Sequence, residues 1–129
     1  MDITQLRKWN FGEDEVVAKN LQQLVLEGKK TAATGLYKGT SQILSKTGDM
    51  AVIITYTGKP LCIIEYTQIT LVSFLEVTYE YIAKEGEGDR DVESWRDSHR
   101  DFFIREYSDL FNEHSLVVCE EFKVVEILE

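Results

Sequence analysis

Cysteine, proline and histidine are scarce in this chain of 129 residues, which contains two cysteines, one proline and two histidines. Cys62 and Cys119 each lie inside an apolar, strand-like run. In such runs a small buried thiol is more usual than a disulfide or a metal ligand. The sequence therefore predicts neither a disulfide framework nor a cysteine-based metal centre, and we expect no cofactor.

Long apolar runs are also missing. No segment approaches the roughly 20 apolar residues that a membrane-spanning helix needs, and the opening stretch MDITQLRKWNFG lacks the apolar core of a signal peptide. We therefore expect a cytoplasmic protein with no membrane partner. A composition of 43% hydrophobic and 29% charged residues is typical of a globular protein, and residues 1–129 are expected to form a single domain.

Basic residues are few and unevenly distributed. The formal net charge is −9, yet residues 28–60 hold five basic and one acidic group, a sum of +4. Residues 61–129 hold six basic and seventeen acidic groups, a sum of −11. Because attraction to a phosphate backbone grows with the number of phosphates neutralised, we do not expect binding to long nucleic acid without sequence preference.

The hydrophobic pattern of the first half predicts one helix followed by strands. Apolar residues at i, i+4, i+7 and i+8 predict an amphipathic helix that begins in the acidic run 13–15 and ends at Gly28. An extended segment is expected after that glycine. Strands over 50–56 and 61–67, joined by a turn over 57–60, are expected to form a β-hairpin.

Two further helices and a closing strand are predicted in the second half. The helices are expected over 73–86, with Gly86 as its end, and over 92–112, with a strongly aromatic face. The segment 115–128 is β-branched and predicts a strand pair or one long bent strand. The order α, β, β, β, α, α, β favours an α+β fold with a small antiparallel β-barrel and flanking helices.

The stretch GKKTAATG, residues 28–35, concentrates lysine and threonine in an acidic protein. Lys29 and Lys30 could be exposed partners of the helix dipole. Alternatively, each lysine lowers the pKa of the other, and a neutral amine can take a proton. Thr31 and Thr34 could then bind a polar ligand or act as nucleophile beside a base. The spacing does not separate these roles.

The loop Glu85–Asp91 alternates acidic residues with glycine. Carboxylates in this pattern could bind Mg²⁺ or Ca²⁺, but the ligand order of an EF-hand is absent, so we do not expect a metal site. The simpler interpretation is a turn that ends one helix, with Asp91 near the start of the next. A functional role requires only that one carboxylate points back toward Lys30.

Trp95, Arg96, His99 and Phe103 fall on one side of the third predicted helix. Core packing is the expected role of Trp95 and Phe103, although a ring at the edge of a cleft could stack on a nucleobase. His99 could be a general base, but no serine–histidine–acid arrangement is visible around it. We interpret it as structural.

Five motifs extend over nearly the whole chain: Trp9-x-Phe11-Gly12, Gly28-Lys29-Lys30-Thr31-Ala32, Thr47-Gly48-Asp49, Ala83-x-Glu85-Gly86-Glu87-Gly88-Asp89 and Trp95-Arg96-x-x-His99. Together they resemble the bacterial ASCH-domain proteins. The resemblance implies a PUA-like fold and a cleft beside the barrel that holds RNA or a nucleoside. Relatives in this superfamily include an amidohydrolase that removes the acetyl group from N4-acetylcytidine, and members with ribonuclease activity.

The family signature is Gly-x-Lys followed five residues later by arginine. Gly28 and Lys30 match its first half, whereas Gly35 stands at the position of the arginine. In the amidohydrolase a threonine three places after the lysine has a catalytic role, and here that position is Ala33. The catalytic glutamate of that enzyme aligns with Glu85 or with the second glutamate of the loop.

The leading hypothesis is a cleft that binds a nucleoside or nucleotide and hydrolyses an amide on a modified pyrimidine. The resemblance implies a neutral Lys30 that activates Thr34 or water, and Glu85, preferred because it ends a helix, as the proton shuttle. The expected ligand-binding residues are Lys29, Thr31, Glu87 and Trp95. The alternative is a non-catalytic RNA-binding module that uses residues 28–60 as its positive surface. A third possibility is a protein that binds no ligand.

Overall fold

The computed structural model describes residues 2–11 and 14–128. In chain order its elements are η1 (Ile3–Gln5), β1 (Arg7–Trp9), α1 (Glu15–Leu26), β2 (Ala32–Leu36), β3 (Met50–Ile54), β4 (Pro60–Ser73), η2 (Phe74–Glu76), α2 (Tyr79–Glu85), α3 (Val92–Tyr107) and β5 (Leu116–Ile127). The expected positions of Gly12 and Glu13 lie outside the described residues. No helix in the described part is long and apolar enough to cross a membrane.

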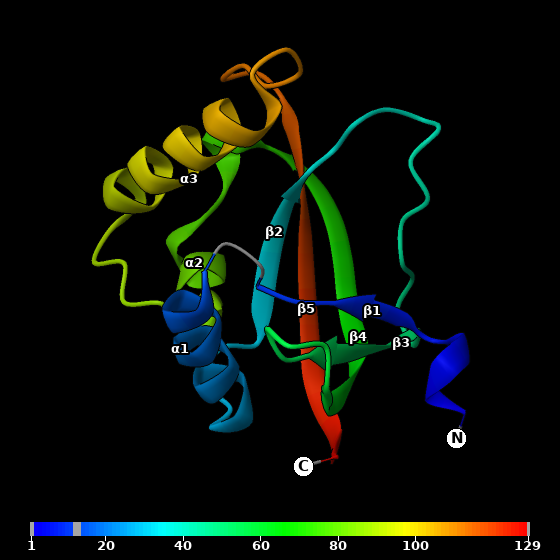
Figure 1. Cartoon of the computed structure of the whole chain (residues 1–129). Coiled ribbons are helices and arrows are strands. Elements are labelled where there is room, and N and C mark those ends of the chain that lie inside the picture. The colour runs from blue at the N-terminus through cyan, green and yellow to red at the C-terminus, as the bar shows by residue number, and fades with distance from the viewer. Residues whose placement is uncertain (1, 12–13, 129) are drawn as a thin grey trace.

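The α+β fold is confirmed, and its sheet is a curled half-barrel of five strands in the order β1-β3-β4-β5-β2. Long β4 and β5 pair antiparallel along most of their length, and bulges interrupt their register at Ile63/Ile64 and Tyr66/Gln68. Bulges increase the local twist and bend a strand pair. Figure 1 shows α1, α2 and α3 together on one side of the curled sheet.

The expectation of a purely antiparallel sheet is wrong at one edge. Residues Arg7–Trp9 form β1, which pairs parallel with β3. This strand was not predicted, because three residues are too few to show a hydrophobic periodicity. Its position matters, since the chain just after β1 borders the cavity described below.

The helix predicted over 73–86 is shorter than expected. Strand β4 continues to Ser73 because its β-branched second half pairs with β5. Helix α2 begins only after Thr78, whose hydroxyl accepts a hydrogen bond from the backbone N–H of Tyr81. Helix α3 ends at Tyr107 rather than near residue 112, while Phe111 beyond it still packs against the core.

Two groups of apolar side chains form the core. One lies under α2 and α3 and includes Phe74, Trp95 and Phe103, all fully buried, so the core role expected for Trp95 and Phe103 is confirmed. The other lies within the curl of the sheet. Cys62 and Cys119 are buried free thiols, as predicted, and burial raises their pKa values to about 11 and about 12.

Candidate functional site

Lys30 is a buried lysine, with only 3% of its surface exposed. Its Nζ donates to the backbone oxygens of Ala32 at 2.8 Å and Glu85 at 3.4 Å, and pairs with Oε2 of Glu87 at 2.6 Å. These three acceptors match the three hydrogens of an ammonium group. A buried charge is tolerated when it is paired in this way. The three acceptors and the ion pair therefore favour a charged Lys30 over the neutral base expected from the sequence.

The end of α2 reaches Lys30 because of one glycine. Gly86 ends the helix in the left-handed conformation, with φ of 67°. A Cβ at this position would lie 2.0 Å from the backbone oxygen of Lys29. The backbone N–H of Thr31 bonds to the oxygen of Lys84 at 2.7 Å in the same contact. Only glycine allows the two backbones to approach this closely without strain.

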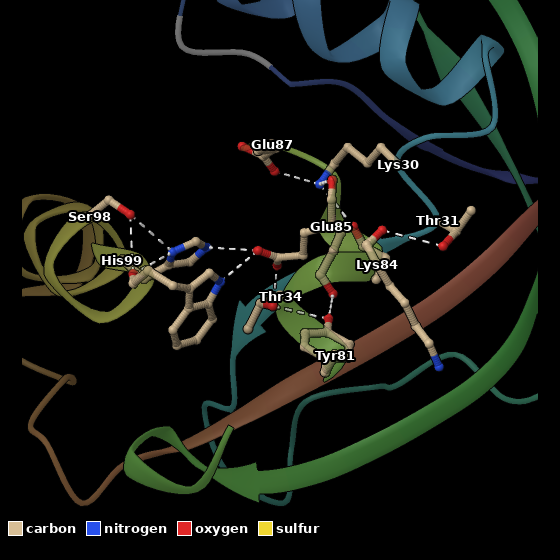
Figure 2. Close-up of polar contacts among 12 residues, drawn as sticks. Lys30, Thr31, Thr34, Tyr81, Lys84, Glu85, Glu87, Ser98 and His99 are labelled. Carbon is tan, nitrogen blue, oxygen red and sulfur yellow. Dashed lines mark hydrogen bonds and ion pairs between the residues drawn. The ribbon is translucent and has the colours of Figure 1, made fainter. Parts of the chain in front are cut away.

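Glu85 is the most buried acid of the site, with 1% of its surface exposed. Its Oε1 accepts a hydrogen bond from Nε1 of Trp95 at 2.6 Å, and its Oε2 lies 2.5 Å from the hydroxyl of Thr34. Nε2 of His99 is 3.6 Å from Oε1. Figure 2 shows His99 next to one oxygen of this carboxyl group and Thr34 next to the other.

Thr34 has two possible partners for one hydroxyl hydrogen. Besides Glu85, its oxygen lies 3.0 Å from the phenol oxygen of Tyr81. Tyr81 donates its own hydrogen to the backbone oxygen of Ala33 at 2.7 Å, and a carbonyl can only accept. Burial, followed by the neighbouring Cys119 and Glu85, raises the pKa of Tyr81, so this phenol keeps its hydrogen at neutral pH.

His99 is more than a packing residue. Its ring stacks on Trp95, with centroids 4.2 Å apart and planes 22° apart, and Nδ1 lies 3.0 Å from the backbone oxygen of Trp95. The ring also borders the cavity, and 19% of its side chain is exposed. The expectation that His99 is only structural is therefore incomplete, because the ring borders the cavity and its Nε2 faces Glu85.

These groups share a cavity of about 440 Å³. Its wall comes from the segment after β1, from α1, β2, the end of α2 and α3. The lining residues are Trp9, Asn10, Phe11, Val17, Leu21, Lys30, Ala33, Thr34, Glu85, Glu87, Ser98, His99, Phe102 and Arg105. The volume and the mixture of aromatic, aliphatic and a few convergent polar groups are typical of a small-molecule site.

The structure brings together Lys30, Thr34, Glu85 and Glu87, four of the residues that the sequence singled out. The other three residues expected to be catalytic or to bind ligand, namely Lys29, Thr31 and Trp95, do not line the cavity. Lys29 is 67% exposed at its side chain and pairs with Glu27 at 3.4 Å. The hydroxyl of Thr31 bonds to the backbone oxygen of Lys84 at 3.3 Å, as Figure 2 shows. Trp95 has no exposed surface, so it orients Glu85 and does not stack on a ligand.

The apolar part of the wall was not predicted. Val17 and Leu21 belong to the stripe of α1 that was expected to face the core, but Val17 is 37% exposed and both border the cavity. Phe102 and Arg105 come from α3. An apolar stripe looks the same in a sequence whether it packs on a core or lines a hollow, so periodicity does not distinguish these residues.

The acidic loop has a structural role at the end that leads into α3. Asp91 caps α3, and Ser94 completes a reciprocal capping box, which confirms the placement of Asp91 near the start of that helix. Its pKa is lowered chiefly by the hydrogen bond from the backbone of Ser94. Among residues 2–11 and 14–128, no three histidine, cysteine or acidic side chains are grouped so that they could hold a metal ion.

Comparison with known proteins decides the family. The ASCH domain matches residues 7–126. This chain is an ASCH-domain protein. It is similar to the ASCH domain from Lactobacillus crispatus JV V101, with 36% identity and a TM-score of 0.83, over 93% of this chain and 79% of that one. The family expected from the five motifs is therefore confirmed.

Other solved structures share the ASCH fold with this chain. Protein EF3133 from Enterococcus faecalis V583 is 28% identical, with a TM-score of 0.84, over 99% of this chain and 85% of that one. A mutant of ZmASCH from Zymomonas mobilis is 10% identical, with a TM-score of 0.51, over 81% of this chain and 63% of that one, and shows the fold alone. The comparison with curated proteins gives no match.

Proposed function

We propose that this ASCH-domain protein binds a nucleoside in the 440 Å³ cavity and hydrolyses an amide on its base, with N4-acetylcytidine as the test substrate. The observation that carries the proposal is the 2.5 Å contact between the Thr34 hydroxyl and a buried carboxyl of Glu85, beside the held cation of Lys30. We also propose a PUA-like barrel and a cytoplasmic location, both of which are expected from the sequence.

The hydroxyl of Thr34 is the proposed nucleophile. As its oxygen bonds to the acyl carbon, its hydrogen passes to Oε2 of Glu85, which acts as general base. The C–N bond then breaks, and the amine leaves with the proton that Glu85 returns. Water next attacks the threonine ester by the same exchange, which releases acetate and regenerates the hydroxyl.

Lys30 contributes electrostatics in this mechanism. Its Nζ donates to the backbone oxygen of Glu85 and to Glu87, so it fixes the end of α2 that carries the base. A positive charge in a partly dry cavity also stabilises negative charge that develops on the acyl oxygen. In this mechanism the base is the carboxyl group of Glu85, and Lys30 is a fixed cation in place of the neutral base expected from the sequence.

The apolar wall supports an aromatic ligand. Trp9 and Phe11 meet edge to face with ring centroids 5.3 Å apart, and Phe102 borders the cavity from α3. Rings of this kind stack on a nucleobase in many proteins. The net charge of −9 makes a long RNA strand a poor partner, so we favour a small ligand over an RNA-binding module.

Incubation of the purified protein with N4-acetylcytidine, followed by chromatography, tests the proposal through the release of cytidine. Wild type and a Thr31→Val control are expected to release it, and Glu85→Gln is expected to release none above background. No release by wild type at high protein concentration would contradict the hydrolase. Binding of short RNA that weakens steeply with salt, without hydrolysis, would favour the RNA-binding alternative.

A further inference from the structure

The positions of hydrogen atoms around His99 follow from its partners. Nδ1 faces the backbone oxygen of Trp95 at 3.0 Å, and that oxygen can only accept. Ser98 lies 3.5 Å from Nδ1, but its hydroxyl donates to the same Trp95 oxygen at 3.1 Å, so we infer that Nδ1 carries the hydrogen. In the neutral ring this leaves Nε2 without hydrogen, and Nε2 faces Oε1 of Glu85 at 3.6 Å. A proton placed between these two atoms would join them by a hydrogen bond.

The contacts of Oε2, the other oxygen of the same carboxyl group, also lack one hydrogen. The hydrogen of Tyr81 is committed to Ala33, so the hydrogen of Thr34 serves either Oε2 of Glu85 or the Tyr81 oxygen, but not both. A proton on Oε2 provides a hydrogen for each of these contacts, because Glu85 then donates to Thr34 and Thr34 donates to Tyr81. One additional proton therefore has two favourable positions, one at each oxygen of Glu85.

We propose that Thr34, Glu85 and His99 form a proton relay in which Nε2 of His99 stores the proton that leaves Thr34. In the starting state the additional proton lies on Oε1, so Glu85 is neutral. As the Thr34 hydroxyl passes its proton to Oε2, the Oε1 proton moves to Nε2, so Glu85 stays neutral and His99 becomes an imidazolium. The reverse transfer supplies the proton for the leaving amine. His99 acts through Glu85 and is a positioning residue for the reaction.

The surroundings of His99 suit this role. Stacking on Trp95 and the Nδ1 hydrogen bond fix the ring plane and direct Nε2 toward Glu85. The 3.6 Å separation is longer than a formed hydrogen bond, and such contacts commonly tighten when a ligand closes the site. Figure 2 shows that the ring of His99 approaches Glu85 from α3.

The charges near His99 come from three elements. Glu85 faces it from α2, the ion pair of Lys30 with Glu87 lies in the same cavity, and Arg105 on α3 lines that cavity too. The carboxyl group of Glu85 lies 3.6 Å from Nε2, within ion-pairing distance. Because glutamine cannot take the negative charge that stabilises an imidazolium, Glu85→Gln should reduce the fraction of His99 that is protonated.

Nitrogen NMR of labelled, full-length protein tests the hydrogen positions without any substrate. The chain has two histidines, so exposed His114 serves as the internal control. We expect neutral His99 to carry its hydrogen on Nδ1. At the pH where His114 is half protonated, Glu85→Gln should lower the protonated fraction of His99 and leave His114 unchanged. An Nε2–H form of neutral His99, or no response to Glu85→Gln, would overturn the relay.

Kinetics test what the relay does, and this part alone rests on the proposed function. With N4-acetylcytidine, His99→Gln retains a hydrogen-bond donor but cannot store a proton, so kcat should fall about 100-fold with little change in KM. His114→Gln should match wild type. If wild type releases no cytidine, the hydrolase fails while the NMR result still decides the relay. Unchanged kcat and pH profile in an active His99→Gln enzyme would contradict it.

Discussion

Lys29 and Lys30 are neighbours in the chain but have opposite environments. Lys29 is largely exposed, whereas Lys30 is buried and holds Glu87 and two backbone oxygens. The sequence identified the pair as a candidate site and required one loop carboxylate to point toward Lys30. The spacing alone did not separate the roles of the two lysines, and the preference for Lys30 came from the family signature. Which lysine turns inward depends on how the chain leaves α1, where the N–H groups of both lysines bond to the oxygen of Leu24.

Replacement of each lysine by methionine separates their roles. Lys30→Met leaves the carboxylate of Glu87 and two backbone oxygens without their donor, so we expect the free energy of unfolding to fall by about 1–3 kcal/mol. Lys29→Met should change it by less than about 0.5 kcal/mol, because its ion pair with Glu27 is exposed. Urea unfolding measures both. Equal losses in the two variants would mean that Lys30 is solvated and the site geometry is wrong.

Thr34 and Thr31 form a second matched pair. Thr34→Val keeps the shape of the side chain but removes the oxygen next to Glu85, and we expect cytidine release to fall about 100-fold or more. Thr31→Val loses only a 3.3 Å contact with the backbone of Lys84 and should keep its activity. Chromatography measures the rate of cytidine release by each variant. A Thr34→Val enzyme with wild-type rates would show that another oxygen is the nucleophile.

At the scale of elements, short α2 determines where both glutamates lie. Its start at Thr78 was not predicted, because the apolar run before it reads equally well as strand or helix. Its end at Gly86 was predicted from a single glycine, and the structure confirms it. The sequence therefore predicted where α2 ends, next to Glu85. Where α2 begins depends on how far β4 pairs with β5.

Gly86 and Gly88 test this element. Both have positive φ, but a Cβ at Gly86 would meet the backbone of Lys29 at 2.0 Å, whereas one at Gly88 would meet nothing within 4 Å. We expect Gly86→Ala to cost about 2–4 kcal/mol and Gly88→Ala about 1 kcal/mol. Thermal unfolding monitored by circular dichroism compares them. Similar costs would mean that α2 does not press against residues 29 and 30.

Strand β5 carries a partly buried acid, Glu120, whose effect on stability depends on pH. Burial raises the pKa of Glu120, and the ion pair with Arg7 at 3.8 Å only partly opposes this. A raised folded-state pKa means that the native state holds the proton more tightly. The contribution of Glu120 is therefore favourable below its unfolded pKa near 4.5 and is lost as pH rises through the folded pKa.

Glu120→Gln should accordingly gain stability relative to wild type as the pH is raised from about 4.5 to 7. Glu121→Gln is the control, because Glu121 is the adjacent acid but has a 2.8 Å ion pair with Lys84, and no such gain is expected. Urea titrations at several pH values provide the comparison. A constant difference between Glu120→Gln and wild type across this range would contradict the role of burial.

For the molecule as a whole, the cavity depends on how the three helices pack beside the edge of the sheet. The segment after β1, helix α1, strand β2, the end of α2 and helix α3 all contribute to one wall, although they lie far apart in the sequence. The sequence predicted the α+β class, the hairpin and the family. It could not predict which apolar residues of α1 would border a hollow, because that depends on how helices pack across a curved surface.

A crystal structure of Glu85→Gln with N4-acetylcytidine would show whether Thr34 reaches the acyl group. We expect the base in the 440 Å³ cavity beside Phe102, with the acyl carbon roughly 3–3.5 Å from the hydroxyl oxygen of Thr34. A nucleoside bound elsewhere, such as the hollow between α1 and the turn between β3 and β4, or an acyl group directed away from Thr34, would contradict it.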